Sequence, residues 1–133
     1  MTVTGYAGDI SSMFDKLDGV VVLKALAYVL ERAASLVVRR YNLRRKIRRH
    51  ITLHLSDSTR HGIGVSYYGE SSVTISFEQI VDVCTYYIKH TYFILSNVLI
   101  LLRLGIPQGG PLSGPLSQIF TVYCEYIMHN SLY

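Results

Sequence analysis

The segment 105–115 constrains the fold most, because it holds all three prolines and four of the ten glycines of the chain. Proline lacks the backbone N–H that helices and sheets need, and glycine is costly to order in either element. The segment therefore predicts a loop. Pro115 suits the first turn of a following helix, where its missing N–H would have no partner in any case. This last helix, expected over 115–129, would bury five larger side chains: Leu116, Ile119, Phe120, Tyr123 and Ile127.

Two further helices are expected, each from apolar residues at helical spacing behind a capping residue. Asp18 is placed to cap a helix over 19–38. Ser76 and Gln79 have the S-x-x-Q spacing of a capping box, in which each side chain bonds the other residue's free backbone N–H. This pair predicts a helix over 77–90. The apolar residues that keep helical spacing in the first of these helices are Leu23, Leu26, Ala27, Leu30, Ala34 and Val37.

Strand patterns are weaker than the helical ones. A short strand is expected over Val3–Ile10, and apolar and polar residues alternate over Ile51–Leu55. The apolar runs Tyr92–Leu95 and Val98–Leu104 are joined by Ser96-Asn97 alone, and a two-residue connection of this kind predicts a hairpin. Turns are expected at Gly62, Gly64 and Gly69.

The composition is not that of a disordered chain, and the length corresponds to one domain or to part of one. Half of the residues are hydrophobic and 17% are charged, whereas a disordered chain needs low hydrophobicity and high charge. The elements above then predict an α+β fold with a small antiparallel sheet packed on about three helices. Cys84 and Cys124 stand far apart in apolar runs and form no metal-binding or disulfide pattern, so we expect them to be small buried hydrophobic residues.

No membrane attachment or secretion is expected from the sequence. The most apolar window, Tyr92–Ile106, is shorter than the roughly 20 residues of a membrane span and contains polar residues. The first residues, MTVTGYAGDISS, lack the basic and apolar regions of a secretory signal. The expected location is intracellular, either nuclear or cytoplasmic.

A basic run marks the region between the first two helices. Seven of the thirteen lysines and arginines fall within 39–49, and no acidic residue interrupts them. Such a run favours a polyanionic partner such as nucleic acid, although a solvated loop and a nuclear-targeting patch remain alternatives. Base stacking and core packing are likewise both open for the eleven tyrosines. The candidate nucleic-acid-binding residues are Arg39, Arg40, Arg44, Arg45, Lys46, Arg48 and Arg49.

The loop at 105–115 also carries chemical information. Its glycines at 105 and 110 have the spacing of a phosphate-binding P-loop, but the Lys and Ser or Thr that should follow are absent. Gly109 and Gly110 have no side chain, so another molecule can approach their backbone closely. Gln108 offers an amide donor and acceptor at a helix entrance. A nucleotide or a nucleic-acid backbone would suit this surface, and an ordinary strand-to-helix connection is the alternative.

The residues GIPQGGPLSGPLSQIFTVYCEY resemble motif B of reverse transcriptases, the RNA-directed DNA polymerases. In that family a G-[IV]-P-[QM]-G-S-P-L-S loop leads into a helix. This chain departs from the pattern at Gly110, where the family often has serine, and at the additional Gly114. The segment 77–103 resembles the helix and hairpin that precede motif B in polymerases of Penelope-like elements and group II introns.

The residues GDISSMFDKL resemble motif A, D-I-x-x-x-F-D-x-[IL], of the same family. The resemblance implies that Asp9 and the backbone carbonyl of Ile10 bind Mg²⁺ or Mn²⁺, and oxygen ligands of this kind suit hard cations. It also implies that Phe14 lies under the sugar of the nucleotide. Gln108 and Gly109 would contact the incoming nucleotide and the template. Taken alone, an Asp before a helix is more often a cap.

The resemblance implies one partial palm domain with part of the fingers over 1–133. Motif A falls near 5–18 and motif B near 105–129. The parent reaction joins a dNTP to a primer 3′-hydroxyl on an RNA or DNA template. The chain contains no [YF]-x-D-D motif, so we expect it to be inactive alone and a longer chain to supply the missing parts. A degenerate, non-catalytic nucleic-acid-binding module is the alternative.

Overall fold

The structure, a computed structural model, describes residues 17–41, 48–57, 59–64, 71–101, 105–106 and 110–132. Within these residues the helices are α2 (Gly19–Arg40), α3 (Phe77–Lys89) and α4 (Ser113–Ser131). The strands are β1 (His50–His54), β2 (His61–Ile63), β3 (Ser72–Ser76), β4 (Tyr92–Leu95) and β5 (Val98–Leu101). Both sheets are antiparallel, in the orders β2-β1-β3 and β4-β5. The α+β class is confirmed.

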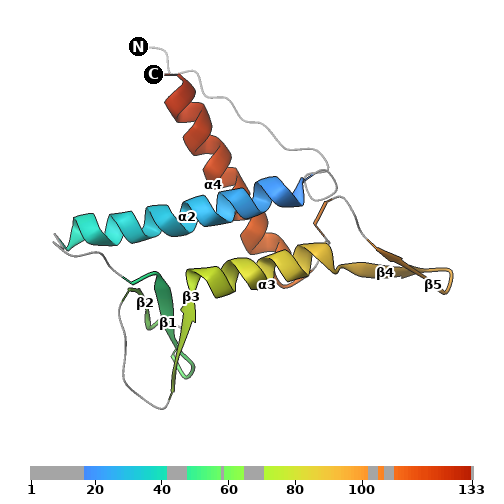
Figure 1. Ribbon diagram of the computed structural model, residues 1–133, viewed down its shortest axis with the longest axis horizontal. Coiled ribbons are helices and arrows are strands. Elements are labelled where there is room, and N and C mark those ends of the chain that lie inside the picture. Colours follow the sequence, from blue (N-terminus) through green and yellow to red (C-terminus); the bar gives the residue numbers. More distant parts are fainter. Residues whose placement is uncertain are drawn as a thin grey trace, which may run out of the picture.

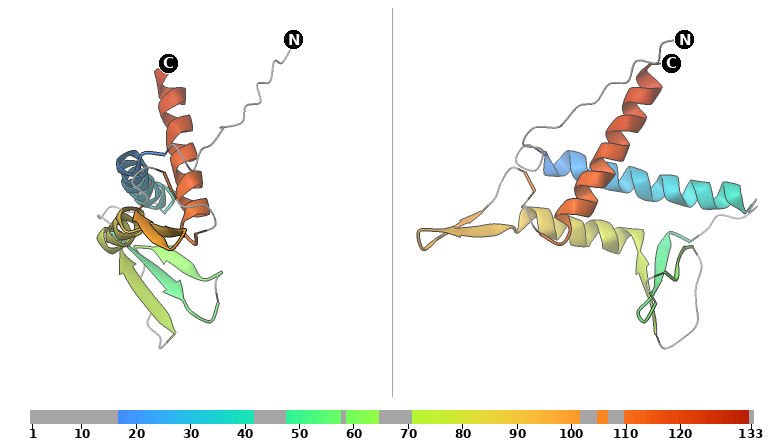
Figure 2. Two further views of the ribbon diagram at one scale, coloured as in Figure 1. Left: turned by 90° about the vertical axis from the view of Figure 1, so that its right-hand side faces the viewer. Right: turned by 180° about the vertical axis from the view of Figure 1, so that it is seen from behind.

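Helix α3 organises the arrangement of the other elements. Helices α2 and α3 lie side by side, and α4 crosses α2 (Figure 1). Strand β3 runs directly into α3, so the three-stranded sheet lies at the N-terminal end of this helix. The β4–β5 hairpin leaves the opposite end and points away from the helices and from the other sheet (Figure 2).

One apolar core joins the three helices. Burial of each large aliphatic side chain in such a core is worth about 1.5–3 kcal/mol relative to exposure. Gly19 permits the close approach of α2 to α3, because a Cβ at this position would lie 2.5 Å from Cγ2 of Ile88. The buried residues come from the helices and from the segments that precede α2 and α4. They are Leu17, Val22, Leu26, Leu30, Ala34, Phe77, Cys84, Ile106 and Leu116.

The three predicted helices are confirmed to within two residues at each end. Helix α4 begins at Ser113, so Pro115 lies third in the helix, still within the first turn. Two predicted core positions are wrong. Ala27 is exposed because it faces a groove between α2 and α3, and Ile127 is 44% exposed in the last turns of α4. Among the described helices, none combines the length and hydrophobicity needed to cross a bilayer.

Both predicted N-caps are confirmed. Asp18 Oδ1 accepts a hydrogen bond of 2.9 Å from the N–H of Val20. The N–H of Gln79 donates to Ser76 Oγ over 3.1 Å, and the N–H of Ser76 donates to Gln79 Oε1 over 2.9 Å. Each bond satisfies a backbone donor that the first turn of a helix leaves without a partner.

Substitution Ser76→Ala is expected to lower the free energy of unfolding by about 1 kcal/mol, because it leaves a backbone N–H of α3 without an acceptor. Urea denaturation followed by circular dichroism measures this loss. Ser35→Ala, an exposed site within α2, is the matched control and should cause no loss. Equal effects of the two substitutions would contradict a stabilising capping box.

The strand predictions are partly confirmed. The pattern at 51–55 corresponds to β1, and the hairpin forms with Ser96 at φ 49° and Asn97 at φ 64°, as a type I′ turn requires. The prediction of a turn at Gly62 is wrong, because this residue pairs with Thr52 inside β2. Strands β2 and β3 were not predicted. The predicted strand at 3–10 and the extension of the hairpin to 104 lie outside the described residues.

The cysteine prediction holds for the first of the two residues. Cys84 is buried in the core, and burial raises the pKa of its thiol. A raised pKa disfavours the reactive thiolate, as expected for a packing residue. Cys124 is half-buried in α4, and both thiols are free.

Candidate functional site

The predicted catalytic and nucleotide-binding residues lie outside the described part of the chain. These residues are Asp9, Ile10, Phe14, Gln108 and Gly109. The structure does describe residues that lie near them in the sequence. Residues 17–18 follow Phe14, and residues 105–106 and 110–113 lie on either side of Gln108 and Gly109. The frame of the candidate site is therefore built from these flanks.

A backbone hydrogen bond joins the two motif-like segments. The N–H of Gly105, the first residue of the loop, donates to the carbonyl of Leu17 over 3.1 Å. Leu17 ends the segment that resembles motif A, so residues 88 positions apart meet here. Leu17 is 5% exposed and Ile106 is 2% exposed, and both belong to the apolar core. Gly105 has a φ of 86°, which only glycine adopts readily. The contact fixes the end of one segment against the start of the other.

A second contact fixes the far end of the loop. The N–H of Ser113 donates to the carbonyl of Gly110 over 3.3 Å, and the hydroxyls of Ser113 and Tyr87 are 2.9 Å apart in a hydrogen bond. Tyr87 comes from α3, so the last residues before α4 are held on that helix. Its hydroxyl also occupies the space above Gly110. A Cβ on Gly110 would overlap this hydroxyl and would lie 3.0 Å from both Cζ of Tyr87 and Oγ of Ser113.

The glycine at position 110 therefore has a local explanation. The motif that this loop resembles often has serine at this position, whereas the present chain has no room for a side chain while Tyr87 keeps its place. The sequence did not indicate this role of Tyr87. Its partner lies 26 positions further along the chain, and nothing in the local pattern indicates this pairing.

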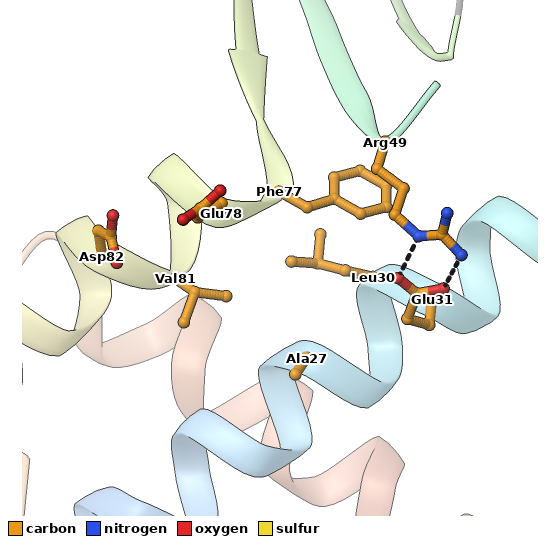
Figure 3. A pocket seen from close by; sticks show the side chains of 8 residues that line it. All are labelled: Ala27, Leu30, Glu31, Arg49, Phe77, Glu78, Val81 and Asp82. Atoms are coloured by element: carbon orange, nitrogen blue, oxygen red, sulfur yellow. Dashed lines mark hydrogen bonds and ion pairs between the residues drawn. The ribbon is translucent and has the colours of Figure 1, made fainter. Parts of the chain in front are cut away.

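A groove of about 320 Å³ runs between α2 and α3 (Figure 3). Its apolar lining includes Leu30 and Phe77. Glu31 and Arg49 close one end with two hydrogen bonds, of which Nη2 to Oε2 measures 3.0 Å. The bonds and the charge of Glu31 raise the pKa of Arg49. Both side chains are about half exposed, so solvent screens the pair and it adds little to stability. The remaining lining residues are Ala27, Glu78, Val81 and Asp82.

The predicted nucleic-acid-binding residues differ in their charge environment. Arg49 has its charge matched by Glu31. Arg39 and Arg40 end α2 and are exposed, and Arg48 is exposed beside β1. Cations in the last turn of a helix also interact favourably with its dipole. The other three candidates, Arg44, Arg45 and Lys46, lie outside the described residues.

Tyrosines gather where α2 and α4 cross. The ring centroid of Tyr28 is 5.3 Å from that of Tyr123 and 4.8 Å from that of Tyr126. Desolvation raises the pKa of Tyr28 to about 12, and the hydrogen bond to Tyr126 contributes to this rise. The bonds to Tyr28 and Asn130 lower the pKa of Tyr126. Of the two roles that the sequence left open for the tyrosines, these three rings therefore have the packing role and not that of base stacking.

The described residues do not form a metal centre. In that part of the chain no three His, Cys, Asp or Glu side chains come together at a spacing that suits a metal ion. The predicted ligands, Asp9 and the carbonyl of Ile10, are oxygen donors of the type that Mg²⁺ and Mn²⁺ prefer. Both belong to the segment before residue 17, which lies outside the described residues.

The chain was also compared with known proteins. A scan against protein-family models and searches of curated proteins and of solved structures found no match.

Proposed function

We propose that this chain is the motif A to motif B part of an RNA-directed DNA polymerase. The parent enzyme would join a dNTP to the 3′-hydroxyl of a primer on an RNA or DNA template. The observation that supports this most is the hydrogen bond between Gly105 and Leu17. It holds together the two segments that resemble motif A and motif B, and a polymerase site needs residues from both at one place.

Two further observations support the proposal. The elements that come before the loop are a helix and a hairpin, as the resemblance of segment 77–103 implies. The described flanks of the loop are held by Tyr87 and by the core, so a ligand that contacts these flanks would meet a pre-positioned backbone. Pre-positioning lowers the entropy that is lost on binding.

The proposed roles follow the resemblance. Asp9 and the carbonyl of Ile10 would hold Mg²⁺ or Mn²⁺, which in such enzymes stabilises the charge on the reacting phosphate. Phe14 would lie under the sugar, and Gln108 with Gly109 would contact the nucleotide and the template. A single carboxylate offsets little of the dehydration cost of a divalent ion. Polymerisation therefore requires the second carboxylate pair from another segment.

Metal-dependent nucleotide binding tests the proposal. Titration of the purified chain with a fluorescent dNTP should give binding that requires Mg²⁺ or Mn²⁺. Asp9→Asn should weaken it at least about tenfold, because the carboxylate supplies the charge that holds the ion. Asp82→Asn, an exposed site on α3, should leave it unchanged.

One outcome would count against the proposal, and another against the expectation that the chain is inactive alone. The first is nucleotide binding that does not depend on metal or on Asp9. The second concerns catalysis: we expect no primer extension, so extension above an Asp9→Ala control would contradict the expectation that the chain is inactive alone.

The second candidate function is a non-catalytic nucleic-acid-binding module. The exposed Arg39, Arg40 and Arg48 favour it, since no acidic partner faces them among the described residues. The affinity of such a module for nucleic acid falls steeply as the salt concentration rises and does not depend on Asp9. The salt dependence of binding to single-stranded RNA therefore separates the two functions.

The Glu31–Arg49 pair gives this alternative a specific prediction. Glu31→Gln removes the acidic partner of Arg49, so RNA binding should become tighter. The slope of the logarithm of the binding constant against the logarithm of the salt concentration should become steeper by about one. Fluorescence anisotropy at several salt concentrations measures both quantities. Glu125→Gln, on an exposed site of α4, provides the control for a change in net charge. If both substitutions act equally, the effect is one of net charge and Arg49 has no place at the interface.

A further inference from the structure

The crossing of α2 and α4 places two tyrosine rings close enough to react with each other. The ring centroids of Tyr28 on α2 and Tyr126 on α4 lie 4.8 Å apart, with their planes inclined at 36°. This separation is at the short end of the range for aromatic pairs in proteins. Within the part of the chain that the structure describes, tyrosine rings contact one another only at this crossing, where Tyr123 is the third member. Of the described tyrosines, these are therefore the ones placed for a reaction between two rings.

The orientation of the pair suits the carbon–carbon bond that forms when tyrosines are oxidised. The carbons that join are those beside the hydroxyl groups. A hydrogen bond between the hydroxyls of Tyr28 and Tyr126 brings these carbons together. The linked product has inclined rings, because its hydroxyl groups prevent a flat arrangement, and the rings of this pair are already inclined. Tyr123 is less well placed, since its ring is further from that of Tyr28, at 5.3 Å, and more steeply inclined, at 57°.

Tyr126 is the ring of the pair that an oxidant in solution reaches more easily. It is 41% exposed, whereas Tyr28 is partly buried. Hydrogen bonds from Tyr28 and Asn130 lower the pKa of Tyr126. Tyrosine loses an electron more readily once its hydroxyl proton has left, so a lowered pKa favours oxidation at this ring. The first radical is therefore expected on Tyr126, next to its partner.

We propose that Tyr28 and Tyr126 are a site of oxidative cross-linking, at which hydrogen peroxide and a haem peroxidase join α2 covalently to α4. Each tyrosine gives up one electron and its hydroxyl proton. The two radicals form a bond between the carbons beside their hydroxyls, and the hydrogen on each joined carbon moves to the oxygen of its own ring. The peroxide takes up the two electrons and the two protons and leaves as two molecules of water. This inference is independent of the polymerase proposal, because it uses no residue of the predicted site.

The cross-link has a structural consequence, because positions 28 and 126 lie far apart in the sequence. A covalent bond that closes a long loop removes conformations from the unfolded chain and so favours the folded state. The folded state needs only small rotations of the two rings, since they are already in contact. Reactants held in this way react with each other faster than with a second molecule. The product should therefore be a monomer that resists unfolding more than the unmodified chain.

Oxidation of the purified chain with hydrogen peroxide and a haem peroxidase tests the proposal. We expect the blue fluorescence of dityrosine, a monomer that has lost two hydrogen atoms in mass spectrometry, and a higher urea midpoint. Trypsin cleaves after Lys24 and Arg32, so Tyr28 falls in the peptide 25–32, which contains no other tyrosine. The digest should contain this peptide linked to 104–133, and fragmentation should place the link at Tyr126.

Substitutions of tyrosine by phenylalanine assign the site and keep a ring at each position. Tyr126→Phe should lower the yield of the linked monomer at least about fivefold, because Tyr28 loses the partner that is held beside it. Tyr123→Phe should leave the yield unchanged. Tyr86→Phe, at a residue that is 67% exposed on α3, is the control for the loss of an exposed tyrosine and should also leave it unchanged.

Three results would overturn the proposal. The first is a chain without a cross-link under conditions in which the same oxidant couples free tyrosine. The second is dityrosine that is found only between two chains, because the crossing then does not hold the reacting pair. The third is a link from the peptide 25–32 to Tyr123, or a yield that Tyr126→Phe leaves unchanged.

Discussion

Substitution Phe77→Ala is expected to lower the free energy of unfolding by about 3–5 kcal/mol, the range for removing a buried aromatic ring. Phe77 is 6% exposed and begins α3. Its N–H donates to the carbonyl of Arg49 over 3.1 Å, and its ring packs with Leu30 of α2 beside the groove (Figure 3). Phe77 thus joins the end of the sheet to both helices, and its alanine variant keeps the backbone bond but loses the packing of the ring. Total stabilities are about 5–15 kcal/mol, so the loss is a large fraction.

Denaturation in urea, with circular dichroism and tyrosine fluorescence as separate probes, measures this loss. Val83→Ala lies on the exposed side of the same helix and should change stability by no more than about 0.5 kcal/mol. The dependence of the free energy of unfolding on urea concentration should be the same in both variants as in the unmodified chain if unfolding remains two-state. A cost below about 1 kcal/mol for Phe77→Ala would mean that the sheet and α2 do not share this contact.

The helices could be predicted from the sequence because their signals are local. A cap, an apolar repeat and a breaker all lie within one segment, as Asp18 and the Ser76–Gln79 pair illustrate. Strands β2 and β3 depend instead on pairing with β1. The residues of β3, Ser72–Ser76, are partly exposed and largely polar, and their order comes from a register with β1 that no local pattern encodes. For the same reason Gly62 was mistaken for a turn.

The frame of the candidate site was only partly predictable. The loop at 105–115 follows from its prolines and glycines, and its resemblance to motif B supplies the proposed site residues. The contacts that hold the loop do not follow, because they join residues distant in sequence. Gly105 bonds Leu17, and Ser113 bonds Tyr87. The exposed Arg39 and the ion-paired Arg49 are also indistinguishable in a basic run until Glu31 is placed beside one of them.

Substitution Gly110→Ala is expected to lower the free energy of unfolding by about 2–3 kcal/mol. The added methyl group would overlap the hydroxyl of Tyr87, and overpacking of this kind costs about 1–3 kcal/mol. Moving the ring away would also break the bond between Tyr87 and Ser113, worth about 1 kcal/mol. Gly114→Ala is the matched control, since a Cβ there meets nothing within 4 Å. It should be neutral or slightly stabilising, because alanine orders in a helix at lower entropic cost.

A double-mutant cycle with Tyr87→Phe isolates the contact between the two residues. Phenylalanine removes the overlapping hydroxyl and leaves ring carbon Cζ, which lies 3.0 Å from where the added Cβ would stand, so a small shift of the ring suffices. Gly110→Ala should then cost about 1 kcal/mol or less, giving a coupling of about 1–2 kcal/mol between the sites. The entropic effect of replacing glycine is the same in both backgrounds and cancels. If the cost of Gly110→Ala is unchanged by Tyr87→Phe, the glycine is required for its backbone and not for the space that Tyr87 occupies. If the coupling is found, Gly110→Ser should be tolerated in the Tyr87→Phe background, and the loop would accept the residue that motif B often carries at this position.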